Sequence, residues 1–298
     1  MKQKLIVISG PTAVGKTSLS IETAKTLHTE IISADSRQFY KELNIGVAAP
    51  SKAQLSEVKH YFIRHLSVTD YYNVSRFEQD VLKLLKMLFE KYEYVVMVGG
   101  SGLYIDAVCK GIDALPDPDP ELREKLKDMT ADKGLEPLRI RLKELDPDYY
   151  GIVDLDNPNR LLRALEVCMI TGEPYSKLRK NKPRKRNFEI IKIGLDRPRS
   201  ELFSLIENRV DMMIKQGLEA EVKNLQQFRH LNALNTVGYK EIFKYLDGDW
   251  TLDLAIEKIK INTRRYAKRQ LTWFKRDNEI MWFHPDELQK ILKHILKN

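Results

Sequence analysis

A glycine-rich segment that follows an apolar run constrains the fold of this chain more than any other feature. Residues 9–18 read Ser-Gly-Pro-Thr-Ala-Val-Gly-Lys-Thr-Ser and match the phosphate-loop pattern G-x-x-x-x-G-K-[ST]. The run Leu5–Ile8 predicts a buried strand before it, and residues 18–25 have helical spacing after it. In such a strand–loop–helix unit, backbone N–H groups and the helix N-terminus surround an anion. We therefore expect a di- or triphosphate site at Gly10, Pro11, Thr12, Ala13, Val14, Gly15, Lys16 and Thr17.

Two side chains of this phosphate loop have predicted roles. Lys16 is expected to neutralise phosphate oxygens, and the hydroxyl of Thr17 is expected to bind Mg²⁺. The alternative is a glycine-rich turn with a surface lysine, which the agreement of strand, loop and helix disfavours. Because ATP-binding proteins share this loop, the loop alone leaves the chemistry open.

The composition limits the remaining classes of protein. The chain has 298 residues, 43% apolar and 31% charged, enough for one large or two modest domains. It has no run of 18 apolar residues and no signal-peptide pattern, so we expect no membrane span. Cys109 and Cys168 are too few for a disulfide framework and indicate a reducing compartment. We expect a cytoplasmic monomer.

The positive charge is concentrated in two places. The formal net charge of +8 favours a polyanionic partner. Residues 179–186, Arg-Lys-Asn-Lys-Pro-Arg-Lys-Arg, form a basic loop, for which a solvated linker and nucleic-acid contact are equally open. The second concentration lies on a predicted helix and favours nucleic-acid contact. Its cations are Lys258, Lys260, Arg264, Arg265, Lys268, Arg269, Lys275 and Arg276.

The first third of the chain alternates predicted strands and helices, which is typical of a parallel α/β sheet. The predicted strands are 5–8, 30–34 and 94–98, and the helices are 17–27 and 77–91. Ligands of such sheets bind beyond the carboxyl ends of the strands. The strand ends at Gly10, Asp35 and Gly99 are therefore expected to face one site.

The pattern changes where three prolines interrupt residues 116–120. Helical signals follow at 121–129, 135–145 and 160–170, and a strand is predicted at 188–195. The later predicted elements are helices at 200–216, 218–228, 239–245 and 252–274 and a strand at 280–284. We predict an α/β fold: a parallel sheet core like that of phosphate-loop NTPases at 1–115 and 187–298, with a helical insertion at 116–186.

The acid at the end of the second strand separates enzyme classes. An ATPase with this loop normally has an acid after a further strand, but the third strand ends in Gly-Gly-Ser at 99–101. The acid stands instead at Asp35. Its carboxylate can accept a proton from a nucleophile beside a diphosphate. Capping of a following helix and support of Mg²⁺ are equally open.

Other polar groups are less specific. Gly99 and Gly100 allow backbone to approach a ligand, and Ser101 offers a hydroxyl there, although a plain strand-to-helix turn is the alternative. His60 and His65 have no companion at zinc-ligand spacing. We interpret both as structural or nucleic-acid contacts.

Six ordered blocks resemble the tRNA dimethylallyltransferases. They are Gly10–Thr17, Asp35–Tyr40, Val98–Tyr104, Asn159–Glu166, Val237–Glu241 and Thr263–Lys275. The resemblance extends from about residue 4 to residue 284, and only the last block is specific by itself. This family transfers a dimethylallyl group from its diphosphate to N6 of adenosine 37 of certain tRNAs, releasing diphosphate with the help of Mg²⁺.

The resemblance implies a role for most of these residues. It implies that the phosphate loop holds dimethylallyl diphosphate, that Asp35 is the general base, and that Ser101, a threonine in most of the family, presents a hydroxyl. It also implies that Arg209 clamps the leaving diphosphate beside Lys16. The implied contacts to the tRNA anticodon stem-loop are Asp35, Ser36, Arg37, Gln38, Ser101, Arg123, Asn159, Arg160, Leu161, Leu162, Arg163, Val237, Gly238, Tyr239, Lys240, Lys268, Arg269, Gln270, Leu271, Thr272, Trp273, Phe274 and Lys275.

One block departs from the family pattern. Where the family commonly has Gly-Thr-Ala-Lys-Pro, residues 46–50 read Gly-Val-Ala-Ala-Pro, so a hydroxyl and a cation are missing. The change is expected to weaken binding or to mark a different tRNA preference. Two other functions compete: a small-molecule kinase of the phosphate-loop class and a nucleotide-sensing RNA-binding protein without catalysis.

Overall fold

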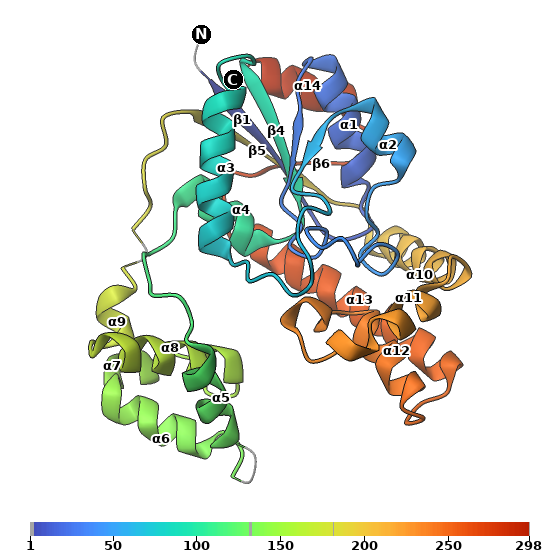
Figure 1. The fold of residues 1–298 in the computed structure, drawn as a ribbon. Helices are drawn as coiled ribbons and strands as arrows, with labels where there is room; N and C mark the ends of the chain where they lie inside the picture. Colours follow the sequence, from blue (N-terminus) through green and yellow to red (C-terminus); the bar gives the residue numbers. More distant parts are fainter. Residues whose placement is uncertain (1–2, 131–132, 181, 298) are drawn as a thin grey trace. The chain divides into compact units, whose positions relative to one another are not determined.

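The computed structural model describes residues 3–130, 133–180 and 182–297 and divides into two units. The sheet unit comprises Met1–Cys109 and Arg186–Asn298, and the helical unit comprises Lys110–Lys185. Figure 1 shows the strands in the first unit and α5–α9 in the second. The helical unit therefore begins six residues before the start expected from the prolines.

The sheet has six strands, all paired in parallel, in the order β3-β2-β4-β1-β5-β6. The strands are β1 (Lys4–Ser9), β2 (Ile31–Ser33), β3 (His60–Tyr61), β4 (Tyr94–Gly99), β5 (Glu189–Leu195) and β6 (Met281–Phe283). The central strand β1 is a continuous apolar run because both faces of a parallel sheet are covered by helices. The predicted parallel α/β class is confirmed.

Helices cover the sheet on both sides (Figure 1). Those of the sheet unit are α1 (Lys16–Thr26), α2 (Lys52–Glu57), α3 (Val74–Leu88), α4 (Gly102–Lys110), α10 (Arg199–Lys215), α11 (Leu218–Asn224), α12 (Tyr239–Leu246), α13 (Leu252–Phe274) and α14 (Leu288–Lys297). One apolar cluster joins α3 and α4 to the sheet, and another joins α1, α10 and α14 to it. A third cluster lies between α10, α11, α12 and α13.

Capping residues explain where the long helices α3 and α13 start. The side chain of Asn73 accepts a hydrogen bond from the Arg76 N–H at the start of α3. Thr251 does the same for the Leu254 N–H at the start of α13. Both helices therefore begin where the sequence places a cap before helical spacing.

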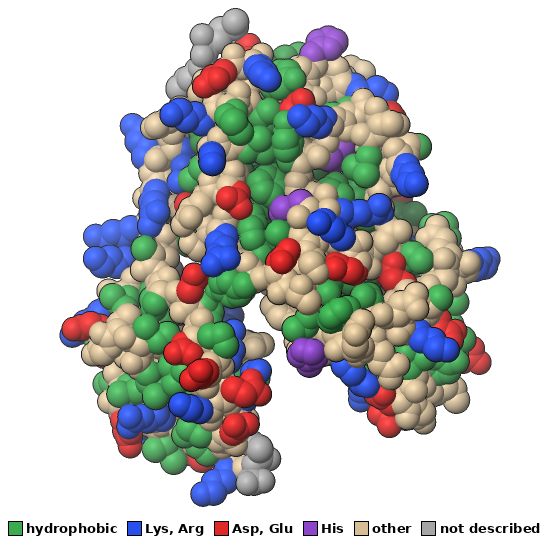
Figure 2. Space-filling model, viewed as in Figure 1, with side chains coloured by type: hydrophobic (Ala, Val, Ile, Leu, Met, Phe, Trp, Pro, Cys, Tyr) green, Lys and Arg blue, Asp and Glu red, His purple; other side chains and the backbone are tan. Residues whose placement is uncertain are grey.

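The helical unit has its own core. Its helices are α5 (Pro120–Asp128), α6 (Glu136–Leu145), α7 (Pro147–Tyr150), α8 (Pro158–Thr171) and α9 (Tyr175–Leu178). Leu138, Leu142, Leu161 and Leu165 are fully buried in it. Figure 2 shows acidic and basic side chains intermixed on the surface of this unit.

Several short elements differ from the sequence prediction. Strand β3 has two residues, and α2 has six, too few for a periodic signal. Helices α4 and α14 were not predicted, and the expected helix 218–228 ends at Asn224, followed by 3₁₀ turns at Gln226–Phe228 and Asn232–Leu234. None of the helices in the described part of the chain is long and apolar enough to cross a membrane.

Candidate active site

A cleft of about 420 Å³ lies at the carboxyl ends of the central strands. The phosphate loop and the end of β2 contribute Lys16 and Asp35 to it. Residues 45–50, helix α10, the segment before α12 and helix α13 form most of the rest of its wall, together with Arg37, Gln38 and Gln54. The phosphate loop after β1 and Asp35 after β2 thus face one site, as expected for a parallel sheet, whereas Gly99 lines a smaller neighbouring cavity with Lys16 and Asp35.

Three residues of the phosphate loop have positive φ angles, which glycine adopts more readily than other residues do. Gly10 and Gly15 have φ angles of 151° and 110°, and Ala13 is left-handed at 66°. A Cβ on Gly10 would lie 2.8 Å from the carbonyl oxygen of Leu195, so a side chain there would displace β5. The glycines therefore allow the loop to pass close to the sheet.

Lys16 is partly buried within this loop. Its ammonium donates to the carbonyl oxygens of Gly10 at 3.0 Å and Pro11 at 2.6 Å. Burial lowers the pKa of Lys16 to about 8, although the nearby Asp35 carboxylate opposes that shift; Arg209 lowers it further. A partly desolvated cation of this kind is stabilised by an anionic ligand.

Arg209 of α10 faces the same anion site. Its guanidinium donates to the hydroxyl of Thr12 at 3.1 Å. Burial lowers the pKa of Arg209, and the Asp35 carboxylate opposes the shift. The charge of Asp35 thus acts on both Lys16 and Arg209.

Asp35 lies in a turn, not at the start of a helix. Its carboxylate accepts the Arg37 N–H at 3.2 Å, and residues 36–39 form turns. The helix-capping interpretation of Asp35 is therefore wrong. Ser101 lies beside this turn, because its hydroxyl accepts the Ser36 N–H at 3.0 Å and contacts the Ser36 hydroxyl at 3.2 Å.

The glycine pair after β4 serves packing rather than ligand approach. A Cβ on Gly99 would lie 2.2 Å from the carbonyl oxygen of Ala34. A Cβ on Gly100 would lie 2.3 Å from the side-chain nitrogen of Gln270. The plain-turn alternative is closer to this arrangement than the expected contact with a ligand.

Gln270 of α13 joins two parts of the site. It accepts the Thr12 N–H at 2.8 Å and donates to the carbonyl oxygen of Gly100 at 2.9 Å. It is 6% exposed, so its main contact is with protein although it lines the cleft. Tyr266, one turn earlier, also lines the cleft, and burial with the nearby Asp35 charge raises its pKa to about 12.

The positive charge of the basic helix α13 is partly neutralised by acids of other elements, which the sequence of the helix does not indicate. Lys260, Arg264 and Lys275 form ion pairs with acids of other elements, Asp211, Glu207 and Asp196. The exposed cations for which the described residues provide no acidic partner include Arg265, Lys268 and Arg269. At 100° per residue, these three side chains project within an arc of about 100° around the helix axis, so they share one face.

Some residues expected to contact tRNA are buried instead. Leu161 and Leu162 belong to the core of the helical unit, and Tyr239 and Phe274 are fully or almost fully buried in the sheet unit. Their side chains pack the protein, so their assignment as contacts is corrected. Among the rest, Leu271 is half-buried, Thr272 donates to the Lys268 carbonyl oxygen, and the partly exposed Trp273 donates to Asp106.

The remaining predicted contacts fall in two groups. In the sheet unit, Arg37, Gln38 and Val237 line the cleft together with Gly238, and Lys240 is exposed. The helical unit exposes Asn159 and Arg160.

Two of the three arginines predicted as tRNA contacts in the helical unit, Arg123 and Arg163, hold its structure together. Arg123 binds the fully buried Glu166 through two hydrogen bonds, one of them 2.7 Å long. Arg163 lies 3.6 Å from the same carboxylate and donates to the Pro116 carbonyl oxygen. Any contact of these side chains with tRNA would compete with pairing of a buried acid.

His60, which the sequence marked only as a structural or nucleic-acid contact, lies beside the phosphate loop. Its Nδ1 lies 2.7 Å from the Val58 carbonyl oxygen, while its buried Nε2 has no partner among the described residues. It lines a small cavity together with Lys16, Thr17 and Asp35. Burial lowers its pKa, which favours a neutral ring that accepts through Nε2. No motif marks this histidine, because only the pairing of β3 with β2 brings it here.

The side chains present are compatible with a ligand-bound Mg²⁺ but not with a protein cage for it. The described residues contain no cluster of three or more His, Cys, Asp or Glu that would hold a metal. Mg²⁺ commonly keeps several waters and binds phosphates with one or two protein oxygens. The hydroxyl of Thr17 and the carboxylate of Asp35 line the same cavity and fit that requirement.

Together, the sheet and the cleft define an α/β protein of the phosphate-loop type that carries a helical insertion. The sequence matches the IPP transferase family over residues 38–277. The chain belongs to this family. The tRNA dimethylallyltransferase 1 of Bacteroides thetaiotaomicron is 53% identical over 98% of this chain and 94% of its own length. The tRNA dimethylallyltransferase of Christiangramia forsetii is 52% identical over 97% and 96%, respectively.

Solved structures agree with this assignment. The tRNA isopentenylpyrophosphate transferase of Bacillus halodurans has a TM-score of 0.73 at 34% identity, covering 99% of this chain and 96% of that one. A eukaryotic dimethylallyltransferase acting on tRNA has a TM-score of 0.77 at 24% identity, covering 99% and 77%. The second likeness concerns the fold alone.

Proposed function

We propose that this protein transfers the dimethylallyl group from dimethylallyl diphosphate to N6 of adenosine 37 of tRNA. The N6 electron pair forms a bond to C1 of the prenyl group, and the C1–O bond breaks with its electrons going to the diphosphate. The N6 proton goes to the Asp35 carboxylate. The names of the relatives support the reaction class, and the residues of the cleft support the individual roles.

The observation that carries the proposal is the position of Asp35 near two partly buried cations of the same cleft. Lys16 and Arg209 are suited to the diphosphate, whose negative charge grows as the C1–O bond breaks. Asp35 is suited to the amine, which must lose a proton. A kinase needs cations too, but the exposed cations of α13 would have no role in it.

Base flipping gives the adenine access to Asp35. An adenine within a stacked stem-loop cannot reach a carboxylate in a cleft, so the base must leave its stack. We assign the flanking contacts to Ser36, Arg37 and Gln38 on one side and to α13 on the other. Ser101 positions the turn that holds Asp35 and presents a hydroxyl near the reacting centre.

Mg²⁺ supplies charge neutralisation on the diphosphate when it is bound. We propose that the Thr17 hydroxyl is its protein ligand. Cys109 and Cys168 are both buried, and we propose that the protein acts in the cytoplasm and as a monomer.

Mass spectrometry of nucleosides from treated tRNA tests the reaction. Unmodified tRNA incubated with the protein and dimethylallyl diphosphate should yield N6-isopentenyladenosine and diphosphate in equal amounts. Release of ADP from ATP with a small-molecule acceptor, without modified adenosine, would assign the chain to the kinases.

The dependence of tRNA binding on salt tests the exposed cations of α13. If Arg265 and Lys268 contact phosphates, the affinity falls with salt at a slope of about −0.7 to −0.9 per contact. Replacing both with alanine should flatten the slope by up to about two units and leave dimethylallyl diphosphate binding unchanged. The matched control replaces Lys83 and Lys86, two exposed lysines of α3. An unchanged slope in the folded α13 variant would contradict the assignment and direct attention to Arg160 and Lys240.

The low pKa of Lys16 predicts how pH affects substrate binding. Below pH 8 the free protein already carries the ammonium that the diphosphate needs. Above pH 8 binding must take up a proton, so the affinity should fall by up to about tenfold per pH unit. Calorimetry with dimethylallyl diphosphate between pH 7 and 9.5 measures this fall. Lys16→Arg stays charged over this range and should show a flat profile; a parallel fall in both proteins would contradict the prediction.

A further inference from the structure

A small cavity adjoins the cleft at Asp35. Its volume is about 40 Å³, more than the roughly 10 to 15 Å³ that one water molecule requires. Ser20 of α1, Ser33 of β2, His60 of β3 and Gly99 of β4 are among the residues that line it. Asp35 lines both this small cavity and the cleft, so the residue borders both spaces.

One acceptor in the small cavity lacks a partner. Nε2 of His60 is buried, and no described residue forms a hydrogen bond with it. The other ring nitrogen, Nδ1, lies 2.7 Å from the carbonyl oxygen of Val58. Because a carbonyl oxygen only accepts, Nδ1 carries the proton of the neutral ring, and Nε2 is left as an acceptor. A buried acceptor without a donor costs free energy, so we expect a donor at Nε2.

The side-chain donors around the small cavity are directed to backbone carbonyl oxygens. The Ser20 hydroxyl donates to the Thr17 carbonyl oxygen at 2.8 Å. The amide of Gln38 donates to two carbonyl oxygens of the 45–50 loop, and the ammonium of Lys16 donates to two in its own loop. A water molecule is therefore the donor that fits both the space and the unpartnered Nε2.

The Asp35 carboxylate needs a further hydrogen bond to hold one orientation. In the part of the chain that the structure describes, it accepts one, from the Arg37 N–H at 3.2 Å, the long end of the range for such bonds. A base that takes a proton from an amine must be oriented towards that amine. A water molecule that donates one O–H to Nε2 has a second O–H for the carboxylate.

Backbone hydrogen bonds join the segment after β3 to the turn that holds Asp35. The Arg64 N–H donates to the Gln38 carbonyl oxygen at 2.9 Å, and the His65 N–H donates to the Phe39 carbonyl oxygen at 2.9 Å. Strand β3 itself pairs with β2, which leads into the same turn. The imidazole and the carboxylate are therefore carried by two segments that are fixed to each other.

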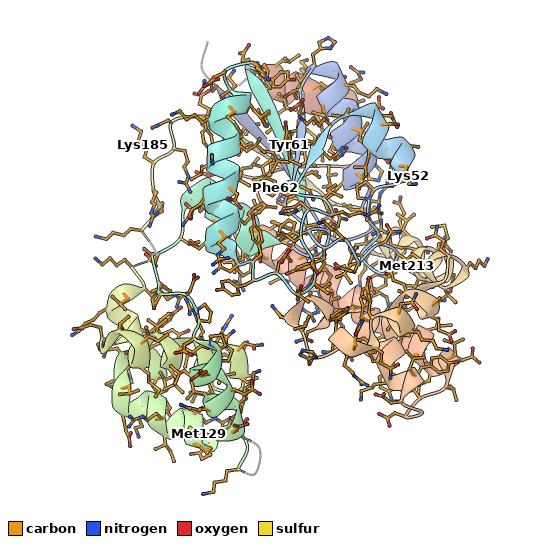
Figure 3. All side chains as sticks on the ribbon, viewed as in Figure 1. Lys52, Tyr61, Phe62, Met129, Lys185 and Met213 are labelled. Carbon is orange, nitrogen blue, oxygen red and sulfur yellow. The ribbon has the colours of Figure 1, made fainter. Side chains whose placement is uncertain are left out.

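Two residues of this segment have a strained backbone. Phe62 and Arg64 are left-handed, with φ angles of 61° and 50°, which is uncommon outside glycine. Tyr61 and Phe62, which directly follow His60, are labelled in Figure 3. Strain of this kind persists where the surrounding contacts impose it, and it is concentrated at functional sites. The strain therefore agrees with a segment that has to place a side chain accurately.

We propose that a water molecule in the small cavity donates one hydrogen bond to Nε2 of His60 and another to the Asp35 carboxylate. His60 is thereby a positioning residue for the general base: it lies outside the cleft lining and acts through the water, which fixes the rotation of the carboxylate. The proposal rests on the proposed function, because it gives Asp35 the same role.

The tautomer of the His60 ring tests the hydrogen-bond pattern without a measurement of activity. NMR of the ring nitrogens in the parent protein at neutral pH should show the proton on Nδ1, and His60→Gln identifies the signals by their loss. A proton on Nε2 would overturn the proposal, because Nε2 would then accept no hydrogen bond from water. This result does not depend on whether the protein prenylates tRNA.

Two substitutions separate the acceptor from the bulk of the ring. His60→Gln keeps an acceptor near the position of Nε2, whereas His60→Leu keeps bulk without one. His60→Leu should lower the single-turnover rate of transfer by at least about tenfold, as loss of a hydrogen bond to a charged group does, and His60→Gln by less than about threefold. Binding of dimethylallyl diphosphate should stay within a few-fold of the parent. Equal losses of rate in both variants, or a larger loss in His60→Gln, would overturn the proposal.

Combination with Asp35→Asn distinguishes positioning from a structural role. If His60 acts only through Asp35, His60→Leu should lower the rate in the parent but by less than about twofold in the Asp35→Asn background. The same loss in both backgrounds would overturn the proposal. If His60→Leu fails to fold, the ring tautomer and the rate of His60→Gln still decide.

A second histidine of the same segment provides the matched control. His65 lines neither the cleft nor the small cavity, so His65→Leu should leave the rate within about threefold of the parent. Absence of prenylation by the parent protein would instead be a failure of the proposed function, which the tautomer measurement keeps separate.

Discussion

Asp35→Asn is expected to lower the rate of dimethylallyl transfer by ~10² to 10⁴, the usual contribution of a general base. The amide keeps the shape of the side chain and its hydrogen bond from the Arg37 N–H, but it does not accept the N6 proton. Binding of tRNA and of dimethylallyl diphosphate should stay within a few-fold of the parent. Single-turnover kinetics with both substrates bound in excess measures the loss directly.

A matched control distinguishes the loss of the Asp35 carboxylate from the loss of a carboxylate elsewhere in the protein. Asp253→Asn removes an exposed carboxylate in the first turn of α13 and should not change the rate. Turnover of Asp35→Asn within a few-fold of the parent would remove Asp35 as the base. Support of Mg²⁺ would then be the role left to it.

Lys16→Ala is expected to weaken the binding of dimethylallyl diphosphate and to lower the transfer rate by ~10² to 10³, as loss of an electrostatic contact to a developing anion does. The ammonium now bound to the Gly10 and Pro11 carbonyl oxygens must turn to the diphosphate, whose charge increases along the reaction. The loss in rate should therefore exceed the loss in ground-state affinity. Lys215→Ala, at the exposed end of α10, is the control.

ATP turnover by the same parent and Lys16→Ala proteins distinguishes a dimethylallyltransferase from a kinase or ATPase. The parent should show no ATP turnover with or without tRNA, since the loop is expected to hold a prenyl diphosphate. Robust ATP hydrolysis stimulated by either substrate, and abolished by Lys16→Ala, would place the chain with the kinases or ATPases.

The parts of the site that follow from local patterns were predictable. The phosphate loop is encoded in eight consecutive residues, and its strand and helix are encoded beside it. The placement of Asp35 at the carboxyl ends of the strands followed from the parallel arrangement of the sheet alone. The roles of individual residues within the cleft remain predictions, which the variants above test.

Contacts between distant segments were not predictable. Gln270 bridges the phosphate loop and β4, and Glu221 holds residues 44–46, yet neither pair has a sequence pattern. The ion pairs of α13 depend on acids in other elements, so the sequence of the helix alone overestimates the number of its cations that are free to bind a polyanion. Leu161 and Leu162 show the limit of resemblance: a motif marks a segment, but only the fold decides which of its side chains reach the surface.

The insertion of the helical unit between β4 and β5 also sets the order in which the chain can assemble. Strand β1 pairs with β5 from Lys4 and Glu189 onward, so one edge of β1 stays open until residues beyond 189 leave the ribosome. The helical unit relies on contacts close in sequence and forms quickly. Once formed, it brings its two ends together, where the Arg184 N–H donates to the Lys110 carbonyl oxygen at 2.7 Å. Closing a shorter effective loop costs less entropy. The inserted unit thus shortens the search by which the sheet completes itself during synthesis.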